Sequence, residues 1–120
     1  MAKILIIDDS NLSRRILRRI LETAGHQVNE AEDGMSGLES YFLDRPDLVL
    51  LDLTMPGMHG LDVLSTLRRM DPTARVVVAT ADIQSSTRVL AEQAGALGFI
   101  NKPLGAENVL TAVNEALKTR

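Results

Sequence analysis

The sequence contains no cysteine, which excludes a disulfide framework and any thiolate metal site. It also has no tryptophan, one tyrosine and two phenylalanines, so it offers few aromatic platforms for stacking nucleobases or a flavin. Its longest apolar runs, such as Leu48–Leu51 and Val76–Ala79, are far shorter than a membrane-spanning helix. The start, Met1-Ala2-Lys3, passes directly into an apolar strand pattern and leaves no room for a signal peptide. These absences predict a cytoplasmic protein.

The charge balance is slightly acidic, with a formal net charge of −3, whereas nucleic-acid-binding domains usually carry a basic balance. Hydrophobic residues make up 45% and charged residues 24% of the chain, as in ordinary soluble globular proteins. A chain of 120 residues is long enough to bury a core. We found no linker, repeat or low-complexity stretch, so residues 1–120 are predicted to form one domain.

Short apolar runs alternate with helix-length amphipathic segments. Continuous runs favour strands buried on both faces. The predicted strands are Ile4–Ile7, Gln27–Ala31, Leu48–Leu51, Val76–Ala79 and Gly98–Ile100, the second and fifth being weaker, and the predicted helices lie near 11–24, 34–44, 60–69, 84–94 and 106–118. Ser10 or Asn11 is a candidate cap of the first helix, Asp33 or Gly34 can open the second, and Gly95 closes the fourth. The alternation predicts an α/β fold of (βα)5 type, a doubly wound five-stranded parallel sheet.

The residues that follow the predicted strands are polar and reactive. In such a sheet, ligands bind outside the carboxyl ends of the strands. Those ends carry Asp8-Asp9, Asp52, Thr80 and, one residue further on, Lys102. Crowded carboxylates repel one another, and either raised pKa values or a bound cation must relieve the repulsion. An all-oxygen cluster suits a hard ion, so we expect Mg²⁺ at Asp8, Asp9 and Asp52.

These motifs together closely resemble the response-regulator receiver domain, a CheY-like family of two-component signalling. The resemblance covers essentially the whole chain and rests on motifs in register: Asp8-Asp9, Ala31-Glu32-Asp33-Gly34, Asp52 with Met55-Pro56-Gly57 and Gly60, Thr80-Ala81, Ala94-Gly95-Ala96 and Lys102-Pro103. It implies the flavodoxin-like strand order 2-1-3-4-5, for which the family is itself a reference example.

The resemblance also implies roles for the polar residues. Asp52 would be the phosphoacceptor, taking a phosphoryl group from a histidine kinase or a histidine phosphotransfer protein. Magnesium would be bound by Asp9, Asp52 and the backbone carbonyl of Thr54, with Asp8 acting through water. Lys102 would contact a phosphoryl oxygen, and its bond to Pro103 would be cis. The protein would be a switch that assists its own phosphorylation and dephosphorylation, and not an enzyme.

Further positions match the family's switch. Thr80 would hydrogen-bond the phosphoryl group, and Phe99 would change rotamer on the surface formed by the fourth helix, fifth strand and fifth helix. Thr54 and Asp82 lie where the family tunes the phosphoryl lifetime. His59 stands where relatives often carry an acidic residue, and its role stays open.

Two alternatives use related chemistry or a related fold. A haloacid-dehalogenase-like phosphatase needs a second acid two residues after the nucleophile, where this sequence has Thr54. A flavodoxin needs a Ser/Thr/Gly-rich phosphate loop, where this sequence has Asp8-Asp9-Ser10-Asn11. The output remains undecided among a freestanding regulator that binds a target protein, as in chemotaxis, a phosphorelay intermediate, and a receiver from a longer protein.

The first predicted helix carries a concentration of arginine. At about 100° per residue, the apolar residues fall on one half of the helix wheel and should face the sheet. They are Leu12, Ile16, Leu17, Ile20, Leu21 and Ala24. The other half holds Glu22 and four arginines, which we expect to be exposed. Because relatives dock the helices of the phosphodonor protein beside this helix, we expect the arginines to contact that protein. These are Arg14, Arg15, Arg18 and Arg19.

Overall fold

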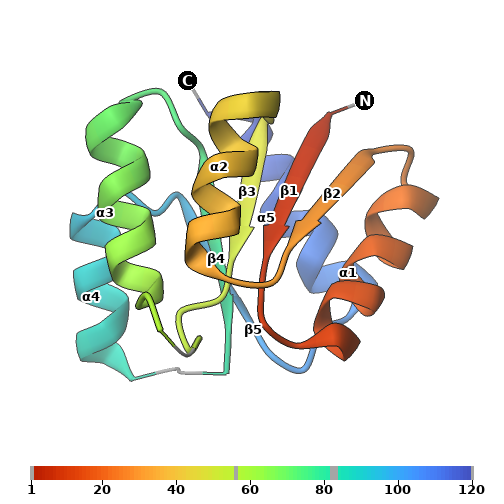
Figure 1. Cartoon of the computed structure of the whole chain (residues 1–120). Coiled ribbons are helices and arrows are strands. Elements are labelled where there is room, and N and C mark those ends of the chain that lie inside the picture. The colour runs from red at the N-terminus through yellow and green to blue at the C-terminus, as the bar shows by residue number, and fades with distance from the viewer. Residues whose placement is uncertain (1, 56, 82–83, 120) are drawn as a thin grey trace.

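The computed structural model describes residues 2–55, 57–81 and 84–119. Five parallel strands form one sheet in the order β2-β1-β3-β4-β5 (Figure 1). The strands are β1 (Lys3–Ile7), β2 (Gln27–Ala31), β3 (Leu48–Leu51), β4 (Val76–Thr80) and β5 (Gly98–Asn101). The predicted fold class and the strand order are therefore confirmed.

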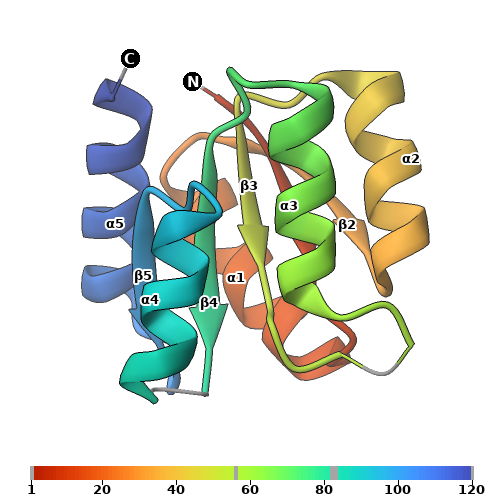
Figure 2. The same ribbon diagram turned by 90° about the vertical axis from the view of Figure 1, so that its left-hand side faces the viewer.

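Five helices cover the two faces of the sheet. They are α1 (Asn11–Thr23), α2 (Gly34–Asp44), α3 (Gly60–Met70), α4 (Ser85–Gln93) and α5 (Ala106–Lys118). Helices α1 and α5 lie on one face, and α2, α3 and α4 lie on the other (Figures 1 and 2). None of these helices is long and apolar enough to cross a membrane.

The central strands are buried on both sides because their side chains alternate between two cores. In β1, Leu5 and Ile7 pack into the cluster under α2 and α3, whereas Ile4 and Ile6 pack into the cluster under α1 and α5. All five residues of β4 are buried as well. Two-sided burial explains why these strands read as continuous apolar runs instead of alternating ones.

The element boundaries agree closely with the predicted ones. Ser10 caps α1, its hydroxyl accepting from the Ser13 N–H at 3.1 Å, and Asp33 caps α2. Strands β4 and β5 each extend one residue beyond the predicted range because Thr80 and Asn101 are still paired with each other. Gly95 follows α4 with a φ of +106°, a conformation that glycine adopts without steric cost.

Candidate functional site

Three carboxylates gather at the carboxyl edge of the sheet. Ile7 and Leu51 are register partners in the neighbouring strands β1 and β3, so the residues that follow them, Asp8 and Asp52, lie at the same edge. One carboxylate oxygen from each of Asp8, Asp9 and Asp52 lies within 4.8 Å of the others. Asp8 and Asp52 are buried, with 1% and 3% of their surface exposed, whereas Asp9 is exposed. The structure thus brings together the three acids that the sequence analysis selected.

Lys102 supplies the positive charge of this cluster. Its Nζ lies 2.9 Å from Oδ2 of Asp8 and 3.8 Å from Oδ2 of Asp52. The same ammonium donates to the hydroxyl of Ser13 in the first turn of α1, at 3.1 Å. The bond between Lys102 and Pro103 is cis, as the resemblance implied. One ammonium therefore faces a cluster of three carboxylates, which leaves an excess of negative charge.

Burial dominates the electrostatics of Asp8. Loss of solvent raises the pKa of its carboxyl group, and the charge of Asp52 adds to this increase. Hydrogen bonds from the Ser10 N–H at 2.9 Å and from Lys102 act in the opposite direction. Because the net pKa shift is upward, ionised Asp8 is held at a cost in free energy. A divalent cation beside the three carboxylates would offset this cost.

The donor set fits a hard divalent cation. All three side chains offer oxygen, the ligand that Mg²⁺ and Ca²⁺ prefer, and exposed Asp9 gives the cluster an opening to solvent. Asp52 is held from one side, because its Oδ1 accepts from both the N–H and the hydroxyl of Thr54, each at 3.1 Å. The acidic triad is consistent with a divalent metal site.

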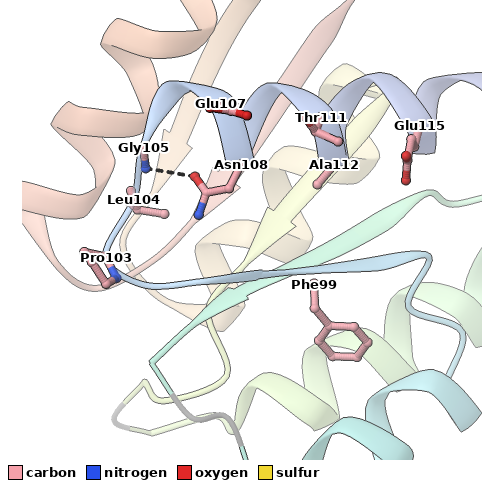
Figure 3. A pocket seen from close by; sticks show the side chains of 9 residues that line it. All are labelled: Phe99, Pro103, Leu104, Gly105, Glu107, Asn108, Thr111, Ala112 and Glu115. Atoms are coloured by element: carbon pink, nitrogen blue, oxygen red, sulfur yellow. Dashed lines mark hydrogen bonds between the residues drawn. The ribbon is translucent and has the colours of Figure 1, made fainter.

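Thr80 and Phe99 lie on neighbouring strands. Thr80 ends β4 and is buried, and Phe99 is a half-buried residue of β5. Phe99 borders two surface hollows of about 670 and 320 Å³, the larger one beside α5 and the smaller between α4 and α5. Its ring points away from α5 (Figure 3), and the guanidinium carbon of Arg88 in α4 lies 4.7 Å from the ring centroid.

The structure corrects the predicted arginine face of α1. Arg14 is buried, with 8% of its surface exposed, whereas Leu12, assigned to the sheet-facing half, is 64% exposed. The physical reason is the helical phase: seven residues at about 100° each bring Leu21 to within about 20° of Arg14, so the two share a face. Arg15 and Arg19 are exposed as expected. Arg18 is partly exposed and forms ion pairs with Glu22 at 2.9 Å and with Glu30 at 2.5 Å.

Sequence reasoning missed the contacts of Ser13, Arg14 and Glu30. Ser13 contacts Lys102, and Arg14 pairs with Glu30 of β2 at 3.0 Å. The available signal was a serine and an arginine three and four residues after the Ser10 cap, but their partners are distant in sequence. His59 precedes α3, is exposed, and makes no side-chain capping hydrogen bond. Asp82, expected to tune the phosphoryl lifetime, and Pro56 of the predicted motif lie outside the described residues.

Comparison with known proteins agrees with this geometry. The family model for the response regulator receiver domain matches residues 4–114. The chain is 41% identical over 116 residues to the chemotaxis protein CheY of Bacillus subtilis, covering 96% of this chain and 97% of that protein. It is 35% identical over 119 residues to protein PilH of Pseudomonas aeruginosa, covering 98% of each.

Solved structures agree as well. The Vibrio cholerae chemotaxis protein CheY4 superposes with a TM-score of 0.91 at 27% identity, covering 97% of this chain and 98% of that one. A CheY-like receiver domain protein from Methanospirillum hungatei gives a TM-score of 0.92, also at 27% identity, covering 98% of this chain and 94% of that one. These matches decide against the phosphatase and flavodoxin alternatives. The chain belongs to the family of response regulator receiver domains, which act as phosphoacceptor switches and not as classical enzymes.

Proposed function

We propose that Asp52 accepts a phosphoryl group from a phosphohistidine of a histidine kinase or phosphotransfer protein, within a receiver domain formed by residues 1–120. The observation that supports this is the convergence of the Asp8, Asp9 and Asp52 carboxylates, together with the Lys102 ammonium 3.8 Å from Asp52. A carboxylate oxygen of Asp52 forms a bond to phosphorus while the phosphorus–nitrogen bond breaks. The electron pair of that bond stays on the imidazole, and Asp52 becomes an acyl phosphate.

The residues around Asp52 have distinct tasks in this proposal. Asp9, Asp52 and the Thr54 carbonyl would hold Mg²⁺ directly, and Asp8 would hold it through water. When bound there, Mg²⁺ would supply positive charge that offsets the charge of the phosphoryl oxygens near Asp52. Lys102 leaves Asp8 and contacts a phosphoryl oxygen. Its positive charge then stabilises the negative charge that develops on that oxygen.

The output of the proposed switch is a change in the surface formed by α4, β5 and α5. Thr80 hydrogen-bonds the phosphoryl group, and Phe99 changes its rotamer. Two features support the choice of Phe99: it borders hollows on both sides, and only part of its side chain is packed into the core. Relatives of nearly the same length named as chemotaxis proteins support an output by direct binding of a protein target.

Phosphorylation by a small donor tests the proposal. With Mg²⁺ and acetyl phosphate, the wild type should gain one acid-stable, base-labile phosphoryl group by intact-protein mass. Asp52→Asn keeps the side-chain shape but removes the nucleophile, so its mass should not change. Equal labelling of the variant would disprove the assignment of Asp52.

A further inference from the structure

Arg14 is a buried arginine whose guanidinium joins three parts of the chain beside the acidic cluster. Its Nη1 donates to the backbone carbonyl of Asp8 at 2.6 Å, and its Nε donates to Oε1 of Glu30 in β2 at 3.0 Å. Its Nη2 donates to the side-chain oxygen of Asn11 at the start of α1. The planar fork of arginine distributes five N–H donors over three nitrogens and serves all three acceptors at once, whereas the three donors of a lysine radiate from a single nitrogen.

The contact with the Asp8 carbonyl bears directly on Asp9. A peptide group is planar, so fixing the oxygen of residue 8 also fixes the amide nitrogen and the Cα position of residue 9. Asp9 itself is exposed, and burial does not hold its carboxylate in place. The orientation of this carboxylate therefore depends on how firmly the peptide that precedes it is held.

We propose that Arg14 is a positioning residue for the divalent-cation site, which fixes the Asp8–Asp9 peptide and thereby aims the Asp9 carboxylate at the ion. This inference rests on the proposed function, in which Asp9 is a direct ligand. It concerns a residue that never touches the ion.

The Nε atom of the Arg14 guanidinium is bound to Glu30, a residue of the sheet. Glu30 is the register partner of Ile6, which lies two residues before Asp8 in the neighbouring strand. Partial burial opposes ionisation of Glu30, but hydrogen bonds and charges from Arg18 and Arg14 hold its pKa below the ordinary value. Glu30 therefore remains a carboxylate at neutral pH, and Arg14 is held between a strand and the β1–α1 turn.

The sign of the effect separates positioning from simple electrostatics. Arg14 carries a positive charge next to a site for a cation, so removing that charge should tighten Mg²⁺ binding if charge alone mattered. If Arg14 acts by positioning, removing it should weaken binding. Groups that orient metal ligands typically contribute 10- to 100-fold to metal affinity, so we expect a loss of about tenfold or more.

The test measures Mg²⁺ affinity by NMR titration of amide signals at constant ionic strength. Arg14→Met removes the fork but retains much of the apolar stem, and Arg14→Lys retains the charge. Both should bind Mg²⁺ more weakly than the wild type. The matched control is Arg15→Met, which removes the same charge from the exposed neighbour and should bind at least as tightly as the wild type. Circular dichroism without Mg²⁺ verifies that each variant is folded. If Arg14→Met does not fold, the Mg²⁺ affinity of Arg14→Lys alone tests the inference.

A second comparison tests whether Arg14 acts through Asp9. In an Asp9→Asn background, adding Arg14→Lys should cause little further loss of affinity. If both Arg14 variants fold and bind Mg²⁺ as tightly as the wild type, or if the loss is as large in the Asp9→Asn background, the inference is wrong. Failure of the proposed function itself gives a different result, because the wild type would then show no Mg²⁺ binding.

Discussion

Nζ of Lys102 lies 2.9 Å from Oδ2 of Asp8, although 94 positions separate the two residues in the sequence. The same nitrogen is 3.8 Å from Oδ2 of Asp52. In this structure, therefore, the lysine is bound to the neighbour of the proposed phosphoacceptor, with Ser13 as its second partner. Phosphorylation of Asp52 would require only a short movement of the ammonium within one cluster.

We expect Lys102→Met to slow phosphorylation of Asp52 by acetyl phosphate. Loss of one group that stabilises developing charge typically lowers a rate by about 10²- to 10³-fold, and we expect an effect of about 10²-fold. Intact-protein mass spectrometry over time measures the rate. Lys118→Met is the matched control, since Lys118 lies at the exposed end of α5 and its loss should leave the rate unchanged. Equal rates for both variants would remove Lys102 from the mechanism.

The exposed arginines of α1 are expected to assist docking of the phosphodonor protein. Arg15→Glu with Arg19→Glu should slow transfer from the cognate kinase or phosphotransfer protein by about tenfold at low salt, because opposite charges steer association. Arg14 and Arg18 are unsuitable for this test, since both bind Glu30.

Acetyl phosphate provides the control for this double variant, because that small donor does not need the helix surface. Parallel losses with both donors would indicate damage to the site. If neither donor is affected, Arg15 and Arg19 form only a solvated face.

The Arg88–Phe99 contact should bias the orientation of the aromatic ring. A cation–π contact at an exposed site is worth about 0.5–1 kcal/mol, so Arg88→Met should increase the population of other Phe99 rotamers several-fold. Side-chain NMR of Phe99 measures these populations. Glu92→Gln is the control, because its ion pair with Arg88 spans 3.6 Å between two exposed side chains and contributes little. Unchanged populations in Arg88→Met would show that the contact does not hold the ring.

The hydroxyl of Tyr41 is expected to stabilise the fold through Asp71, to which it donates at 2.7 Å. Tyr41→Phe should lower the free energy of unfolding at pH 7 by about 1.5 kcal/mol, typical of a hydrogen bond to a charged group. Urea unfolding measures the change. Mg²⁺ affinity serves as the control and should be unaffected.

The effect of Tyr41→Phe should depend on pH with a defined sign. Hydrogen bonds from the Thr73 side chain and from Tyr41 lower the pKa of Asp71 below its ordinary value. Ionised Asp71 therefore stabilises the fold at any pH above the unfolded-state pKa of about 3.9. This stabilisation is lost as the pH falls through the lower folded-state pKa, so wild type and variant should converge in acid. A difference that grows as the pH falls would contradict the assignment.

The fold and the acidic cluster were predictable because both follow from local patterns. Apolar runs mark the strands, and parallel strands bring the residues after them, such as Asp8 and Asp52, to one edge. The Arg14 environment was not predictable in this way. The helical phase places Arg14 on the same face as Leu21, but the acceptors that satisfy its buried guanidinium, Glu30 and the Asp8 carbonyl, are placed beside it only in the folded chain. The exposure of Leu12 has a different cause: at about 100° per residue it lies about 180° from buried Leu21 on the helix wheel, so it faces away from the sheet.

Helices α3 and α4 differ in how firmly they are held against the sheet, and Gly60 contributes to this difference. A Cβ atom at this position would lie 2.4 Å from the Cα of Leu53 and 2.6 Å from the carbonyl oxygen of Asp52, so α3 begins in direct contact with the backbone that follows β3. Buried Val63, Leu64 and Leu67 anchor the rest of α3. Among the described side chains of α4, only Ala91 is buried, and Val89 and Leu90 are half exposed. Few buried contacts mean low local stability. We therefore expect the proposed phosphorylation of Asp52 to displace α4 more than α3.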